Sequence, residues 1–210
     1  VGLGINANAL ENTIYTALFN PRIDVHEIIQ HTKFDGLDII PANIDLSAAE
    51  VQLVTEVGRE QILASVLRPI VNEYDAIFID CQPSLGLLTV NALAAADGVI
   101  IPVAAEFFAL RGVALLMQSI EKVQTRINPS LEVYGVLVTM YTHTLHCDEV
   151  MQRIYEAFGD KVFHSVISRS IKLPDANVAA APITYYAHNH KTAREYREVA
   201  RELIVKGIVA

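Results

Sequence analysis

Residues 74–84 read YDAIFIDCQPS, an apolar run that closes on a carboxylate, Asp80. The polar turn that follows at once consists of Cys81, Gln82, Pro83 and Ser84. A lone acid at the end of a buried strand is costly unless water, a partner or a metal compensates it. We therefore predict a strand over 76–80, in which Asp80 is either a structural acid or a support for Mg²⁺ beside a phosphate.

Strand-like and helix-like runs alternate on both sides of this stretch. Expected strands cover 37–42, 76–80, 98–103, 132–141 and 162–167. Expected helices cover 58–74, 85–96, 107–127, 147–158 and 192–205. Apolar strands separated by helices are typical of a parallel sheet covered on both faces. The sequence thus predicts a single α/β domain over residues 1–210, with a mostly parallel sheet and helices on both faces.

Composition fits a globular protein with a sizeable core, because 52% of the 210 residues are apolar. No apolar run reaches the roughly 18 residues of a membrane span, and the chain shows no charged-then-apolar leader. We therefore expect a cytoplasmic location. The two cysteines, Cys81 and Cys147, lie far apart and do not form a disulfide framework.

The net charge of −8 is unevenly distributed along the chain. Residues 1–160 carry 8 basic and 20 acidic side chains, a balance of −12, whereas residues 161–206 carry 8 basic and 4 acidic ones, a balance of +4. Such asymmetry can indicate a basic face that meets phosphates. Ordinary charge pairing within the last helix, such as Arg194 with Glu198, is the alternative.

In a parallel sheet, ligands bind at the carboxyl ends of the strands. The stretches that leave the expected strands are 80–84, 102–106, 140–146 and 168–172. These four stretches are therefore the places where a functional site is expected.

The segment YDAIFIDCQPSLGLLTVNALAAADGVIIPVAAEFFALRGVALL (74–116) closely resembles the second half of ParA/Soj-type chromosome and plasmid partitioning ATPases. These belong to the deviant Walker A class of P-loop NTPases, together with MinD and the nitrogenase iron protein. The likeness continues through 36–53, 135–141, 158–184 and 193–204, and so covers nearly the whole chain. The resemblance implies a P-loop NTPase-like fold, ATP and Mg²⁺ as cofactors, and homodimerisation on ATP binding.

The resemblance also implies roles for individual residues. Asp80 corresponds to the Walker B acid, which supports Mg²⁺ through a water, and the switch II segment corresponds to Cys81, Gln82, Pro83 and Ser84. Many members have two prolines where this chain has Gln82–Pro83, so its switch II is expected to be less rigid. The residues that the resemblance places at the nucleotide are Met140, Ser168 and Arg169.

ParA-like proteins bind DNA without sequence preference, and a ParB-like partner stimulates hydrolysis and release. Residues in positions suited to contact DNA here are His143, Arg169, Lys172, Lys191 and Arg194. His143 falls near a position that is often arginine, in a stretch that is one residue short. A location on the nucleoid within the cytoplasm follows from this expectation.

The glycine-rich loop that carries the phosphate-binding lysine has no counterpart in these 210 residues, because no glycine precedes Lys-Ser or Lys-Thr. The resemblance places that loop and switch I ahead of a segment such as VGLGI at residues 1–5. A strand-helix-strand unit takes 30 or more residues, so roughly 40 to 50 residues are expected to precede. The chain as printed is expected not to hydrolyse ATP.

Other functions remain open from the sequence. The chain could be a non-enzymatic relative that keeps dimerisation and DNA binding, or a MinD-like ATPase that positions another cargo. His143, His146 and Cys147 resemble metal ligands but lack a fourth partner nearby. The acids within 195–210 argue against binding to an anionic membrane, so no membrane partner is expected.

Overall fold

The computed structural model describes residues 2–82, 84–106 and 109–209, and the side chains of 109–111 lie outside this description. The α-helices are α1 (Ile14–Phe19), α2 (Val25–Ile28), α3 (Leu46–Gln52), α4 (Ile62–Leu67), α5 (Leu87–Ala95), α6 (Ala109–Arg126), α7 (Leu145–Phe158), α8 (Lys172–Val178), α9 (Ile183–Tyr186) and α10 (Lys191–Val205). Short 3₁₀ turns are η1 (Ala7–Ala9), η2 (Leu53–Thr55) and η3 (Gly159–Lys161). The strands are β1 (Gln30–His31), β2 (Asp38–Ile39), β3 (Gly98–Ala104) and β4 (Glu132–Thr139).

The main sheet is parallel. Strands β3 and β4 pair from Gly98 opposite Glu132 to Ala104 opposite Thr139. Two isolated parallel bridges, Val136 with Val162 and Tyr141 with Ser168, extend this sheet along residues 162–168. The predicted strand over 162–167 is therefore present only as bridge pairing, while β1 and β2 form a separate antiparallel pair of two residues each.

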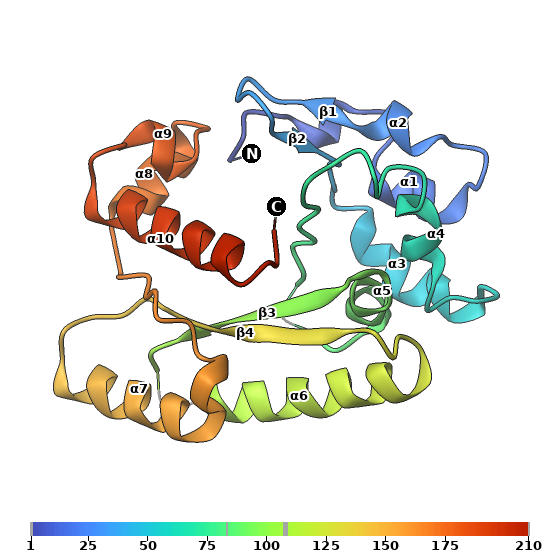
Figure 1. Cartoon of the computed structure of the whole chain (residues 1–210). Helices are drawn as coiled ribbons and strands as arrows, with labels where there is room; N and C mark the ends of the chain where they lie inside the picture. Colours follow the sequence, from blue (N-terminus) through green and yellow to red (C-terminus); the bar gives the residue numbers. More distant parts are fainter. Residues whose placement is uncertain (1, 83, 107–108, 210) are drawn as a thin grey trace.

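Helices cover both faces of this sheet (Figure 1). Because side chains alternate along a strand, Val136 and Val138 pack on one face against α6 and α7, together with Ile120 and Ile154. Leu137 points to the other face, where the core includes Val199 and Leu203 of α10. The α/β arrangement predicted from the sequence is thus confirmed.

A second core lies among the helices of the N-terminal part. Buried residues of α1, α2, α3, α4 and α5 form one cluster there. Asn91 fixes α5 against α4, because its buried Oδ1 accepts a hydrogen bond from the Leu63 N–H at 3.1 Å and its Nδ2 donates to the Arg59 carbonyl at 2.7 Å. Helix α5 joins the two cores, since Ala92 packs in this cluster and Leu93 packs under the sheet.

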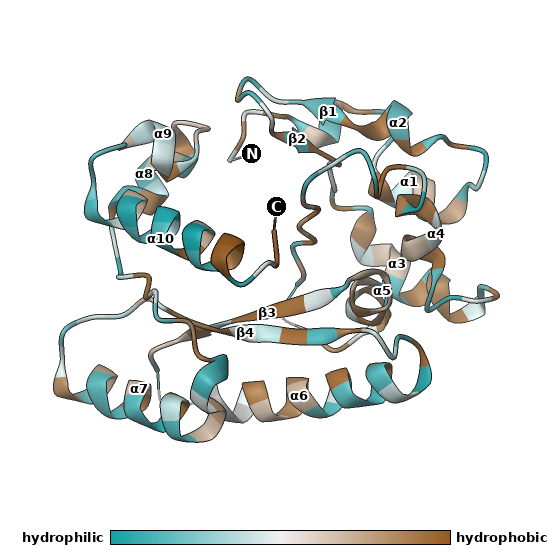
Figure 2. Cartoon of the chain, in the orientation of Figure 1, coloured by the Kyte–Doolittle hydropathy of each residue, from teal (hydrophilic) through white to brown (hydrophobic). Residues whose placement is uncertain are grey.

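The prediction of a buried strand over 76–80 was wrong. This segment has no regular secondary structure and belongs to neither sheet, and Phe78 is 71% exposed. A strand requires a neighbour that accepts and donates ladder hydrogen bonds, and no described residue supplies one to this segment. Figure 2 shows the apolar character of this path between α4 and α5.

The helix predicted over 58–74 is also shorter than expected, because only α4 is helical and turns follow it to Glu73. Pro69 explains this end, since proline has no N–H to donate to the carbonyl four residues earlier. The helices predicted over 85–96, 107–127, 147–158 and 192–205 correspond to α5, α6, α7 and α10.

Candidate functional site

The carboxyl end of β4 meets the segment after residue 167. The Tyr141 N–H donates to the Ile167 carbonyl at 3.1 Å, and the Arg169 N–H donates to the Tyr141 carbonyl at 2.9 Å. This ladder brings three of the sequence-predicted residues together, namely Met140, Ser168 and Arg169. Met140 has a φ of +53°, a conformation that is uncommon for residues other than glycine and is often found at functional sites.

Ser168 is held by the last helix. Its N–H donates to Glu195 Oε2 at 3.0 Å and its hydroxyl donates to Glu195 Oε1 at 2.6 Å. Lys191 Nζ donates to the Ser168 hydroxyl oxygen at 3.1 Å and lies 3.5 Å from the Glu195 carboxylate. The first turns of α10 therefore fix the position of the backbone that carries Arg169.

Glu202, seven residues after Glu195, also holds backbone N–H groups with its carboxylate, so Glu195 and Glu202 form the two glutamate clamps of α10. Its carboxylate accepts hydrogen bonds at 3.0 Å from the N–H groups of His164 and Ser165. Burial raises the pKa of this carboxyl, but the two N–H groups, the Ser165 side chain and the nearby Lys206 ammonium group together hold the pKa below its ordinary value. Sequence reasoning missed both contacts, because it considered the acids of the last helix only for charge pairing within that helix.

We expect Glu202→Gln to lower the free energy of unfolding at pH 7 by about 1–2 kcal/mol, because the charge that accepts two backbone hydrogen bonds is lost. A depressed pKa contributes stability above the unfolded pKa, and that stability disappears as pH falls through the folded pKa. Urea unfolding should therefore separate the variant from the parent at neutral pH and bring them together below the ordinary pKa of 4.5. Glu198→Gln, which removes an exposed surface pair with Arg201, serves as the control, and a gap that persists at acid pH would contradict this account.

Asp80 lies in the irregular segment between α4 and α5, where it is exposed and makes no hydrogen bond or ion pair with a residue that the structure describes. A cavity of about 690 Å³ runs beside this segment, and its walls come from residues 14–92. No described hydrogen bond or ion pair joins Asp80 to the group at Met140 and Ser168. Among the switch II residues, Cys81, Gln82 and Ser84 are exposed, and Pro83 lies outside the described residues.

The approach to Asp80 is anchored from the β1–β2 hairpin. The Tyr74 hydroxyl donates to Asp38 Oδ2 at 2.8 Å, and the other oxygen of Asp38 lies 2.8 Å from His31 Nδ1. Just before it, Glu73 lies 3.0 Å from His26 Nε2. The irregular segment that carries Asp80 therefore starts from a fixed point.

The basic residues predicted to contact DNA differ in how far their charge is already compensated. Lys172 pairs with Asp175 at 3.1 Å, and this hydrogen bond raises the pKa of its ammonium group. Lys191 is held by the Ser168–Glu195 group. Arg169, Arg194 and His143 are exposed without an ion pair to any described residue, although the His143 ring packs edge-on against Tyr141.

Neither a cluster of three metal-ligating side chains nor a membrane-spanning helix is found in the part of the chain that the structure describes. No three His, Cys, Asp or Glu side chains in residues 2–82, 84–106 and 109–209 are grouped as a metal site. Cys147 is buried, with its sulfur 3.1 Å from the Thr142 hydroxyl. No described helix is both long and apolar enough to cross a membrane.

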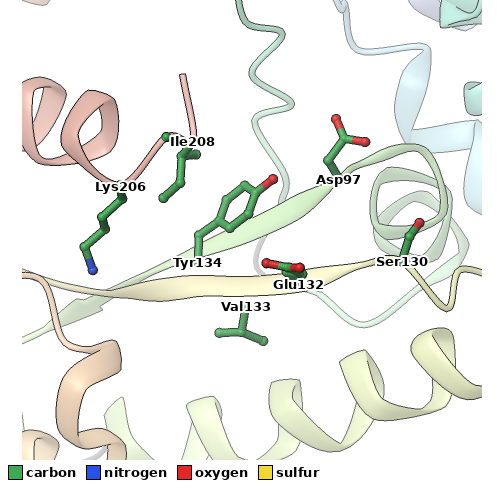
Figure 3. A pocket seen from close by; sticks show the side chains of 8 residues that line it. Asp97, Ser130, Glu132, Val133, Tyr134, Lys206 and Ile208 are labelled. Carbon is green, nitrogen blue, oxygen red and sulfur yellow. The ribbon is translucent and has the colours of Figure 1, made fainter. Parts of the chain in front are cut away.

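A second hollow, of about 430 Å³, lies at the amino ends of β3 and β4 (Figure 3). Asp97, Glu132 and Tyr134 project around it, and Lys206 approaches from the end of α10. Ligands in parallel sheets bind at the opposite, carboxyl ends. This hollow is therefore separate from the group at Met140, Ser168 and Arg169.

The family is identified by comparison with known proteins. Residues 1–133 match the model of a family described as an AAA domain. The structure of cobyrinic acid a,c-diamide synthase from Mycobacterium smegmatis with a bound ATP analogue and magnesium superposes with a TM-score of 0.84 at 32% identity, covering 97% of this chain and 76% of that one. The fold is thus that of a P-loop NTPase.

Two relatives narrow the class. The chromosome-partitioning ATPase Soj of Treponema pallidum is 42% identical over 206 residues, which span 98% of this chain and 80% of Soj. An uncharacterized protein of Mycobacterium tuberculosis is 51% identical over 204 residues, 97% of this chain, and the chain spans 64% of that relative's length. The chain belongs to the ParA/Soj family of partitioning ATPases, and the resemblance stated from the sequence is confirmed.

Proposed function

We propose that the protein is a partitioning ATPase that binds ATP with Mg²⁺, dimerises, and binds DNA without sequence preference until a ParB-like partner stimulates hydrolysis. The observation that carries this proposal is the ladder at the carboxyl end of β4, which unites Met140, Ser168 and Arg169. The site lies where parallel sheets bind ligands. A cytoplasmic location on the nucleoid is part of the proposal.

The residues present fit a magnesium ion at Asp80. Mg²⁺ prefers carboxylate oxygens and waters, and the exposed carboxylate of Asp80 is not engaged by any hydrogen bond or ion pair within the described chain. The ion would neutralise charge on the phosphate oxygens during hydrolysis. Asp80 would hold it through a water, as the family resemblance implies.

The other site residues position rather than react. Phosphoryl transfer to water depends on alignment and on charge stabilisation. Met140, Ser168 and Arg169 would bind the nucleotide base, on a backbone that α10 fixes through Glu195. Cys81, Gln82, Pro83 and Ser84 would sense the terminal phosphate.

The experiment that tests the function uses the full-length gene product. We expect ATP hydrolysis that requires Mg²⁺, and retention of DNA of any sequence in ATP but not in ADP. The 210-residue chain alone should show no hydrolysis, because it contains no Gly-Lys-Ser or Gly-Lys-Thr. DNA retention without any hydrolysis by the full-length product would instead support a non-enzymatic binding module. Retention on anionic vesicles rather than DNA would support a MinD-like role.

The DNA contact should depend most on the cations that form no ion pair with a residue that the structure describes. We expect Arg169→Ala and Arg194→Ala each to weaken DNA retention and to lower the slope of log K against log salt by about 1, since each removes one phosphate contact. Lys172→Ala should have a smaller effect, because Asp175 already balances that charge. The measurement is a salt titration of DNA binding in the presence of ATP.

The control for this series is Arg22→Ala, which removes an exposed cation in the N-terminal part of the fold. An unchanged salt slope for Arg169→Ala, together with weaker ATP binding, would assign Arg169 to the nucleotide alone. An unchanged slope for Arg194→Ala would remove that residue from the DNA surface.

A further inference from the structure

Glu50 of α3 occupies the start of α5, directly after switch II. Its Oε2 accepts a hydrogen bond from the Leu87 N–H at 2.8 Å, and its Oε1 accepts one from the Leu88 N–H at 3.2 Å. Oε1 also accepts from the side-chain amide of Gln82 at 3.1 Å. One carboxylate thus joins three points of the chain that lie more than 30 residues away in sequence.

The local sequence is built around this contact. The N-cap position of α5 is Gly86, which has no side chain to cap the helix itself. A Cβ added at Gly86 would lie 2.4 Å from both carboxylate oxygens of Glu50. The backbone angles of Gly86 are extended and open to any residue, so its conformation does not require glycine. Glycine is needed here because the acid approaches so closely.

The third hydrogen bond reaches into switch II. Gln82 lies two residues after Asp80, in a stretch that carries no regular secondary structure. Many sequences of the resembling family have a proline at this position, and proline restricts the backbone by fixing φ. In this chain the Gln82–Glu50 hydrogen bond supplies a restraint of a different kind at the same place.

We infer that Glu50 is a positioning residue for ATP hydrolysis, which it serves by tethering switch II to α3 through Gln82 and the start of α5. This inference rests on the proposed function, because the reaction that Glu50 supports is the one proposed above. Together with the Tyr74–Asp38 contact, the tether restrains the irregular segment that carries Asp80 at both ends. The direction of the Asp80 carboxylate is set between these two points.

The first test compares Glu50→Gln with Glu56→Gln in the full-length gene product. Glu50→Gln keeps the size of the side chain but turns an NH₂ group toward groups that are themselves donors. Glu56 is exposed at the end of η2 without a hydrogen bond or ion pair from its side chain to a described residue, so its variant controls for the loss of one negative charge.

Two readouts follow. Amide hydrogen exchange at residues 87 and 88 should become at least about tenfold faster in Glu50→Gln, because hydrogen bonds to a charged acceptor are lost. The kcat for ATP should fall about tenfold, as expected for a misplaced catalytic group, with KM little changed. Glu56→Gln should match the parent protein in both. Equal exchange in the two variants, or equal kcat, would overturn the inference.

A second pair of variants tests the tether without touching Glu50. Gln82→Ala removes only the side-chain hydrogen bond, so kcat should fall while exchange at residues 87 and 88 stays slow. Gln82→Pro should recover part of the lost rate, because it restores a backbone restraint. A rate for Gln82→Ala equal to that of the parent would overturn the tether.

The failure of this inference is distinguishable from failure of the proposed function. If the full-length protein hydrolyses no ATP, the proposed function falls, and the role of Glu50 in hydrolysis falls with it. The exchange measurement needs no nucleotide, so it still decides whether Glu50 holds the start of α5. If the parent protein hydrolyses ATP but Glu50→Gln has the same kcat as its control Glu56→Gln, the proposed function stands and the inference about Glu50 alone is wrong.

Discussion

Replacing Asp80 by asparagine is expected to reduce Mg²⁺-dependent ATP hydrolysis of the full-length protein by about 10- to 100-fold, the usual cost of losing a group that orients a metal's own ligands. The carboxylate is exposed and free of ion pairs in the described chain, so the substitution removes no internal salt bridge. The loss should therefore appear as a weaker apparent affinity for Mg²⁺ or a lower kcat, with the melting temperature unchanged. A titration of hydrolysis against Mg²⁺ at saturating ATP measures it.

The matched control is Asp75→Asn, because Asp75 is an exposed acid in the same stretch between α4 and α5, five residues earlier. Asp75→Asn should leave the Mg²⁺ titration unchanged. If both variants lose activity equally, general charge near the site explains the effect and Asp80 has no special role. If neither loses activity, Asp80 is not the magnesium acid, and the Walker B interpretation of YDAIFIDCQPS is wrong.

Local pattern was enough to predict the elements that carry their own periodicity. Helices α6, α7 and α10 have one apolar face each, and their ends agree with the sequence prediction within a few residues. Strands β3 and β4 are apolar runs without polar alternation, and both pair in parallel as expected. These elements needed only the spacing of apolar residues to be identified.

The wrong strand prediction and the contacts that were not predicted have a different physical origin. Whether residues 76–80 form a strand depends on a neighbouring strand, which the segment's own composition cannot supply. The same holds for Glu50 and Glu195, whose partners are backbone N–H groups remote in sequence. A signal existed for Glu50, since Gly86 stands at a helix start where a capping side chain is usual. The effect of Pro69 on the predicted helix could also have been read directly from the sequence.

Phe163 connects the stability of the fold to the position of the site. Its side chain is fully buried, and its ring lies so close to Gly135 that a Cβ there would come within 2.6 Å of it. Lys206 Nζ lies 4.8 Å from the ring centroid on the α10 side. Phe163 thus fills the space between β4 and α10, in the same segment that delivers Ser168 and Arg169 to the end of the sheet.

We expect Phe163→Ala to lower the free energy of unfolding by about 3–5 kcal/mol, because the change leaves a cavity that the flanking sheet and helix cannot fill. Against a typical total of about 5–15 kcal/mol, this is a large fraction of the stability. Phe163→Leu should cost much less, since it keeps most of the volume. Denaturant unfolding of the full-length protein gives both values. Leu145→Ala, which truncates an exposed side chain on α7, is the control.

The same variant tests whether packing behind the sheet positions the nucleotide site. The Ile167 N–H donates to the Val138 carbonyl of β4 and the Arg169 N–H to the Tyr141 carbonyl just beyond β4, both at 2.9 Å. Both residues follow Phe163 in the segment that it anchors. If Phe163 holds this segment against β4, amide exchange at 167 and 169 should accelerate in Phe163→Ala under conditions where α6 stays protected. Uniform acceleration across the chain would instead mean that Phe163 contributes only to global stability, and the site would owe its geometry to the two glutamate clamps of α10.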